Sequence, residues 1–520
     1  MTIKKSVFAV AIVALATAIT SNILTPLTEV SNVIVNTDNT VEQAPSTLYL
    51  SESVPSHKTH RAGQTINIII PGKLSVTGNI NLVQEYAGGI VRIGGSFNEG
   101  TSNEGTFAYA YTDKTVTGVV MMGDEVYELP ETSSQKFTSY INKHIDTFMC
   151  VRHPGEDIVS EGAEVTTGTV TTGTVNTSNI PLLASKPTAK CHLYLEFNGA
   201  TVIDPLWNGG RVIVAKSPGY NEEQIKVIWS IVSERYAAFN INVTTDVAYY
   251  NKAKPTWRQR AILTPSNTWM PGWGGYAFIG SNRLAGMGIY SPTIPCFIFT
   301  NMFGVGSTAI RNVGECVAHE LGHTLGLTHD GTSSSAYYYG QGQWAPIMGA
   351  AYSKAVVQFS RGEYSKANNK QDDLSVITTT NKDVTYTTTP QYAPSLLSIN
   401  DINLSTTISN QSDYRYYRIR VTTPGILSIT AAPGLYSGVD LRVDIINSST
   451  SFILTTSDTA VSQKTTATSP ILLPGIYDIK IYGAGEGNAL TTGYTKYGSI
   501  GTVLVTGTFV STAGGASARK

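Results

Sequence analysis

The strongest signal in the sequence is the run His319-Glu320-Leu321-Gly322-His323-Thr324-Leu325-Gly326-Leu327-Thr328-His329-Asp330. On a helix, His319 and His323 project from the same face, so their two imidazoles can bind one ion. Gly326 has no Cβ, so the backbone can turn there with a positive φ and bring His329 to the same ion. Three imidazole ligands suit zinc and leave a fourth tetrahedral position open for water. Glu320 is not needed as a ligand and can act as general base and acid toward that water.

The order of these residues resembles the HExxHxxGxxH pattern of the metzincin metallopeptidases, and Asp330 directly after the third histidine is similar to the adamalysin or reprolysin branch. The resemblance implies a zinc endopeptidase with one catalytic zinc and Glu320 as the catalytic residue. It also implies a Met-turn beneath the metal, which Ile347-Met348-Gly349 matches, with Met348 packed under the histidines and not ligating. Astacins and serralysins carry a tyrosine ligand two residues after this Met. Ala350 stands there and the nearest tyrosine is Tyr352, so no tyrosine ligand is assigned.

The four cysteines are too few for a disulfide framework in 520 residues. Zymogens of the matrixin and adamalysin groups use a propeptide cysteine as a temporary fourth zinc ligand, and the resemblance makes Cys150 a candidate for this latch. Its neighbours do not match the usual switch sequence, and an ordinary buried cysteine is the alternative. Cys191 could form a disulfide with Cys296 or Cys316 after export. Cys316 lies one helical turn before His319, and we expect it to be buried or bridged and not a ligand.

The chain is expected to be multidomain. Lys4 and Lys5 precede the uncharged run Val7 to Ile19, the layout of a signal peptide, so we expect export to a secreted location; an uncleaved signal anchor is the alternative. The predicted segments are a signal peptide over 1–18, a β-rich pro-domain over 19–161, a low-complexity linker and processing region over 162–190, a catalytic domain over 191–388 and a C-terminal β-sandwich over 392–520.

The catalytic segment mixes strands and helices. A strand-like run at 192–197 precedes a helix that begins with a capping box of Asn221 and Gln224 and runs about five turns to Phe239; Ile241 to Thr244 follows as a strand. A second helix begins near Arg311. This order predicts an α/β domain with a mixed twisted sheet and an active-site helix. The family resemblance further suggests that 297–301 forms the sheet edge along which substrate pairs; an interior strand is the alternative.

The C-terminal segment shows only strand patterns, at 414–421, 426–430, 441–446, 471–473, 476–482 and 502–508. With its runs at 440–444 and 473–480, it resembles the pre-peptidase C-terminal domain of secreted bacterial proteases. That resemblance implies a role in secretion, folding or substrate attachment, and a passive spacer is the alternative.

The composition bears on partners. With 36 basic and 37 acidic residues the net charge is -1, which gives no sign of nucleic-acid binding. We expect a protein or peptide substrate and no stable membrane association once the signal peptide is removed. Asp372 and Asp373 could support a structural calcium ion, with a solvated turn as the alternative. A rival function is a surface adhesion or binding protein whose zinc site is structural or vestigial.

Overall fold

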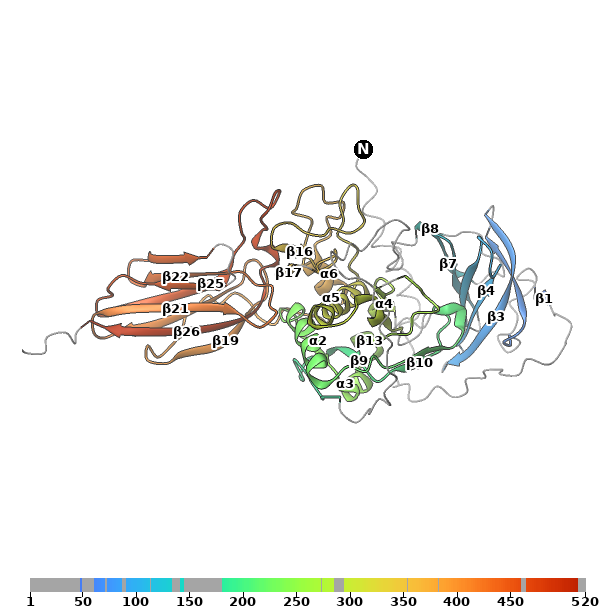
Figure 1. The fold of residues 1–520 in the computed structure, drawn as a ribbon, viewed down its shortest axis with the longest axis horizontal. Helices are drawn as coiled ribbons and strands as arrows, with labels where there is room; N and C mark the ends of the chain where they lie inside the picture. Colours follow the sequence, from blue (N-terminus) through green and yellow to red (C-terminus); the bar gives the residue numbers. More distant parts are fainter. Residues whose placement is uncertain are drawn as a thin grey trace, which may run out of the picture. The chain divides into compact units, whose positions relative to one another are not determined.

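The structure is a computed structural model that describes residues 47–48, 60–70, 73–86, 90–112, 114–132, 141–144, 180–272, 274–284, 294–352, 354–381, 383–459 and 464–512 (Figure 1). The predicted signal peptide, Cys150 and the linker up to residue 179 lie outside the described residues. The chain forms two compact units. The first unit contains residues 1–155, 196–218 and 254–302, and the second contains 156–195, 219–253 and 303–520.

The N-terminal part of the first unit is one sheet in which strands follow each other in sequence order. β1 runs parallel to β2, and each later neighbour pairs antiparallel. The strands are β1 (Thr47–Leu48), β2 (Thr65–Ile70), β3 (Leu74–Tyr86), β4 (Ile90–Phe97), β5 (Gly105–Tyr111), β6 (Val116–Met122), β7 (Glu125–Thr132) and β8 (Ile141–His144). The prediction of a β-rich N-terminal segment is confirmed.

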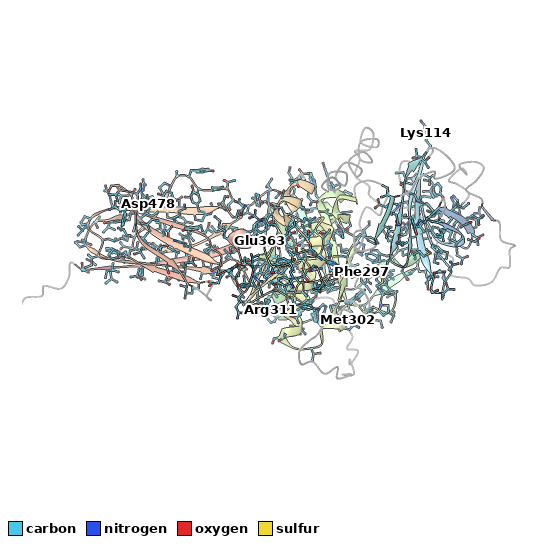
Figure 2. All side chains as sticks on the ribbon, turned by 90° about the horizontal axis from the view of Figure 1, so that it is seen from above. Lys114, Phe297, Met302, Arg311, Glu363 and Asp478 are labelled. Carbon is cyan, nitrogen blue, oxygen red and sulfur yellow. The ribbon has the colours of Figure 1, made fainter. Side chains whose placement is uncertain are left out.

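The first unit also includes pieces of the chain that the sequence assigned to the catalytic segment. They carry β10 (Ala200–Val202), η4 (Asn208–Gly210), β11 (Ile213–Ala215), η5 (Pro255–Trp257), β13 (Arg258–Thr264), β14 (Gly275–Tyr276), α4 (Ser281–Leu284), β15 (Cys296–Phe299) and η6 (Thr300–Phe303). Fully buried Trp207 packs in one core with Val119 and Val126 of the N-terminal sheet and with Phe297, which Figure 2 labels. Apolar burial therefore joins these pieces to the sheet.

The expected substrate edge at 297–301 is wrong. β15 pairs with β13 in parallel on one side and with β14 antiparallel on the other. All four of its residues are buried. Since both of its backbone edges are already paired, this segment is the interior strand of the alternative interpretation.

The second unit begins with β9 (Cys191–Glu196), which pairs in parallel with β12 (Ile241–Thr244). Between them lies α2 (Glu222–Arg235), and the predicted capping box is confirmed, because Asn221 and Gln224 exchange both side-chain to backbone hydrogen bonds. The helix ends at Arg235, a turn earlier than expected, because Tyr236 leaves helical geometry with φ -102° and ψ 9°. The unit also contains α3 (Val247–Lys252), α5 (Ser307–Thr324), β16 (Trp344–Pro346), β17 (Val356–Gln358) and α6 (Asp373–Thr380).

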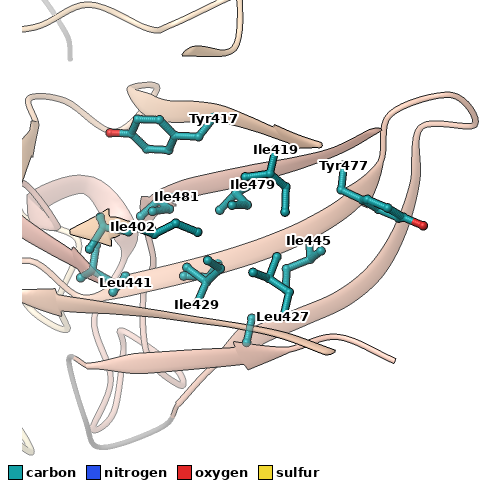
Figure 3. Packing of buried hydrophobic residues seen from close by; sticks show 14 of the residues in the cluster. Ile402, Tyr417, Ile419, Leu427, Ile429, Leu441, Ile445, Tyr477, Ile479 and Ile481 are labelled. Atoms are coloured by element: carbon teal, nitrogen blue, oxygen red, sulfur yellow. The ribbon is translucent and has the colours of Figure 1, made fainter. Parts of the chain in front are cut away.

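The C-terminal part of the second unit consists of two sheets, with strand orders β18-β20-β25-β22-β23 and β19-β26-β21-β24. Buried aliphatic side chains from both sheets, such as Ile419 and Leu427, share one core (Figure 3). The predicted β-sandwich character is confirmed. The elements are β18 (Ser395–Leu396), β19 (Ile402–Ile408), β20 (Tyr414–Val421), β21 (Gly425–Pro433), β22 (Leu441–Asn447), β23 (Phe452–Asp458), β24 (Thr465–Thr468), β25 (Gly475–Gly483), η7 (Lys496–Gly498) and β26 (Gly501–Ser511).

The predicted strand at 471–473 does not form. Only Leu472 of this stretch exchanges backbone hydrogen bonds, with Gly425, as an isolated bridge. Pro470 and Pro474 flank the stretch, and proline has no N–H to donate to a ladder. β21 pairs along its length with β24 and β26.

The possible disulfide between Cys191 and Cys296 or Cys316 does not form. Cys191, Cys296 and Cys316 are buried thiols and are not joined to one another by disulfide bonds. Burial raises the pKa of the Cys191 thiol to about 12, which makes it inert at neutral pH. In the part of the chain that the structure describes, no helix is long and apolar enough to cross a membrane.

Candidate metal centre

Helix α5 provides two of the three predicted ligands. From Val313 to Thr324 every residue of α5 is buried, and Gly314 lets α2 approach closely, since a Cβ there would lie 2.9 Å from the side chain of Ile231. His319 and His323 are 7% and 0% exposed, whereas His329 is half-buried. The pair on the helix is thus fixed by packing, and the third ligand lies toward solvent.

The turn after α5 brings the third histidine back. Gly326 has φ 105°, a left-handed region that favours glycine. The N–H of Leu327 donates to the carbonyl of Gly322 at 3.0 Å, and the N–H of Gly326 donates to the backbone carbonyl of His323 at 2.9 Å. Ligand atoms of His319, His323 and His329 lie within 4.8 Å of one another, and among the described residues these three are the group of His, Cys, Asp or Glu side chains that could hold a metal ion.

The hydrogen bonds of the two helical histidines assign their tautomers. Nδ1 of His319 lies 2.9 Å from the carbonyl oxygen of Ile347, and Nδ1 of His323 lies 2.8 Å from that of Leu327. Burial lowers the pKa of His319 to about 4 and that of His323 well below its usual range, so both rings are neutral at pH 7. A neutral imidazole has one N–H, and a carbonyl oxygen only accepts, so we assign both hydrogens to Nδ1.

The two Nε2 atoms therefore face each other as lone-pair acceptors, 3.0 Å apart. Two acceptor atoms cannot hydrogen-bond to each other, and their lone pairs repel. A cation bound by both nitrogens would remove this repulsion. Nitrogen ligands bound tetrahedrally to zinc at about 2.0–2.1 Å lie about 3.3 Å apart, close to this separation. The carbonyl oxygens that accept from Nδ1 also hold the two rings in orientation, as the hydrogen-bond partners of metal-bound histidines do. The donor set therefore fits zinc.

Met348 packs against helix α5. It is fully buried, and a methyl group added to Gly322 would lie 2.6 Å from its sulfur, so the thioether lies against α5 at Gly322, the residue before His323. The N–H of Asp330 donates to the carbonyl of Met348 at 2.8 Å. This bond ties the residue after the third histidine to the turn that also carries the Ile347 carbonyl.

Glu320, the predicted general base, follows the first ligand on α5 and is 2% exposed. Burial raises its carboxyl pKa well above the usual range. A carboxyl group with a raised pKa holds a proton more readily, as a group that both accepts and returns protons requires.

Other predicted residues lie apart from the histidines or have another role. The ring of Tyr352 packs on Phe303, with centroids 5.8 Å apart. Asp372 caps α6, since its side chain accepts from the N–H of Ser375 at 2.9 Å, and buried Asp373 accepts from the N–H of Ser360 at 2.9 Å. Calcium at these two residues stays a prediction.

Two features near the site were missed by the sequence reasoning. Tyr337 packs its ring on His329, with centroids 4.3 Å apart, and nothing in its loop sequence marks it. Glu315, one turn before His319, forms a buried ion pair with Arg235 of α2, with N–O distances of 2.9 and 2.6 Å. A charged residue inside an otherwise apolar helix face was the available signal for Glu315.

Comparisons with known proteins add little. No family model matches the chain, and no curated protein matches it. Among solved structures, the pre-peptidase C-terminal domain of a collagenase from Bacillus anthracis matches at 13% identity and a TM-score of 0.17, over 23% of this chain and 99% of that chain. The lysozyme inhibitor PliG from Aeromonas hydrophila matches at 8% identity and a TM-score of 0.17, over 23% of this chain and 100% of that chain. A β-1,3-glucan binding CBM6 from Bacillus halodurans matches at 14% identity and a TM-score of 0.14, over 22% of this chain and 98% of that chain. Scores this low carry no argument, so the sandwich rests on its strand pairing.

Proposed function

We propose that the chain is a zinc-dependent endopeptidase of the metzincin type, exported and made with an N-terminal pro-segment. The observation that carries the proposal is the pair of Nε2 atoms of His319 and His323, 3.0 Å apart, with both Nδ1 atoms facing carbonyl oxygens. His329 completes a three-histidine set, which is the ligand number of catalytic zinc sites and leaves one position open.

The chemistry divides between the metal and the protein. A bound zinc ion supplies a Lewis acid that polarises the scissile carbonyl and makes water more acidic. Glu320 takes a proton from the attacking water as the oxygen adds to the carbonyl carbon. The same carboxyl group then gives the proton to the amide nitrogen as the carbon–nitrogen bond breaks. Burial raises the pKa of the Glu320 carboxyl, which makes its carboxylate form a stronger proton acceptor toward the attacking water.

The remaining parts of the proposal rest on the sequence. Residues 1–18 direct export, the linker over 162–190 is the processing region, and Cys150 is the candidate latch on the metal. Cys150 and the linker up to residue 179 lie outside the described residues. The β-sandwich supports folding, secretion or attachment to substrate.

The experiment compares the zinc-loaded protein, processed in the 162–190 region, with its Glu320→Gln variant on a peptide library, with new termini read by mass spectrometry. Glutamine keeps the shape of the side chain and cannot accept the proton. We expect cuts by the unaltered protein and none by Glu320→Gln at equal zinc content. Equal cutting by both would refute the role of Glu320, and no cutting by either would favour the adhesion protein with a structural zinc site.

A further inference from the structure

Tyr337 lies beside the candidate metal centre. Its ring centroid is 4.3 Å from that of His329 and 6.1 Å from that of His319. Tyr337 and His329 are half-buried, whereas His319 and His323 are buried. The phenol is therefore beside the face of the centre that a substrate in water can approach.

The backbone around Tyr337 is fixed. The N–H of Tyr338 donates to the carbonyl of Asp330 at 2.8 Å, and the N–H of Ala350 donates to the carbonyl of Tyr338 at 3.0 Å. The hydroxyl of Ser335 donates to the carbonyl of Tyr337 at 2.8 Å. The ring of Tyr338 stacks on Tyr364 at 4.2 Å with a 7° angle between the planes. The loop is thus tied both to the residue after the third histidine and to the Met-turn.

Peptide hydrolysis places negative charge on the former carbonyl oxygen when water adds to the carbonyl carbon. Preorganised donors aimed at that oxygen stabilise the transition state more than the substrate. A phenol hydroxyl is such a donor.

Resting on the proposed function, we propose that Tyr337 is a catalytic residue whose hydroxyl donates a hydrogen bond to the oxyanion of the tetrahedral intermediate. The tyrosine gives up no proton in this step. Glu320 still accepts the proton of the water and returns it to the leaving amine, so Tyr337 adds stabilisation without changing the balance of the reaction.

The test uses the zinc-loaded processed protein and Tyr337→Phe, which keeps the ring and removes the hydroxyl. Tyr339→Phe is the matched control, because Tyr339 belongs to the same loop and is 47% exposed. The substrate is a peptide that the unaltered protein cleaves. We expect Tyr337→Phe to lower kcat by about 100- to 1,000-fold, the usual effect of removing one oxyanion donor, with KM and zinc content unchanged. Tyr339→Phe should retain full activity.

A second readout does not depend on turnover. A phosphinic analogue of the same peptide imitates the tetrahedral intermediate, and its Kd is measured by calorimetry on the zinc-loaded proteins. Tyr337→Phe should weaken the analogue by a factor close to its loss in kcat and leave binding of the product peptide unchanged. Equal kcat and equal analogue affinity in Tyr337→Phe would overturn the proposal, as would a loss explained by reduced zinc content, which would make Tyr337 a support for His329. If the unaltered protein cleaves nothing, the proposed function itself fails, and the role of Tyr337 fails with it.

Discussion

Replacing Arg235 by methionine removes one partner of a buried ion pair beside the candidate metal centre. Arg235 donates to both carboxylate oxygens of Glu315, at 2.9 and 2.6 Å, and to the carbonyl of Tyr436 at 2.7 Å. The two side chains are 2% and 4% exposed, so solvent cannot replace the lost bonds. Removing one partner of such a pair costs about 3–5 kcal/mol. Arg311 lies 4.0 Å from Glu315 and is 38% exposed, so it would compensate only part of the buried Glu315 charge once Arg235 is replaced.

The assay is urea unfolding of the zinc-loaded chain, followed by far-UV circular dichroism. The Glu320→Gln background prevents self-cleavage. The double variant Arg235→Met with Glu315→Leu should recover most of the loss, because apolar replacement of a whole buried pair is often neutral. Lys226→Met is the control, since Lys226 pairs with exposed Glu222 and should leave unfolding unchanged. The reasoning would be refuted if Arg235→Met cost less than about 1 kcal/mol, or if the two single losses simply added in the double variant.

Three further outcomes are expected. Gly322→Ala places a methyl 2.6 Å from the sulfur of Met348, so it should destabilise the fold by about 1–3 kcal/mol and weaken zinc binding in a competition titration with a chelator. Trp207→Ala empties a fully buried site in the first unit and should cost about 3–5 kcal/mol in thermal unfolding; a loss near zero would contradict the described core. Burial raises the pKa of Asp440 from 3.8 to about 6, so the folded state binds more protons than the unfolded state between these values. Stability should then fall as pH rises through that window, and Asp440→Asn should flatten the urea-midpoint profile there.

Local signals were the reliable part of the sequence. The capping box at Asn221 forms as expected, because its atoms lie three residues apart and need no tertiary contact. The strand at 414–421 has the predicted bounds, since alternating burial marks it at every step. The three histidines come together for the same reason, because helical spacing and one glycine turn place them.

Features that depend on distant partners were missed. Nothing in the sequence of 297–301 tells whether one or both of its edges are paired, and the answer depends on β13 and β14. The strands β23 and β24 are rich in serine and threonine and were not predicted. They form strands because they pair with β22 and β21, which their own sequences do not reveal. Arg235 contacts Glu315 across two helices that are far apart in sequence, and Tyr337 reaches His329 from an irregular loop. No short sequence pattern encodes either contact.

The measurement that tests the metal centre most directly is zinc content and peptide hydrolysis on the same samples of the unaltered protein, Glu320→Gln and His323→Ala. We expect one zinc ion per chain in the first two and none in His323→Ala, with hydrolysis by the unaltered protein alone. Hydrolysis by Glu320→Gln at the rate of the unaltered protein, or full zinc content in His323→Ala, would contradict it.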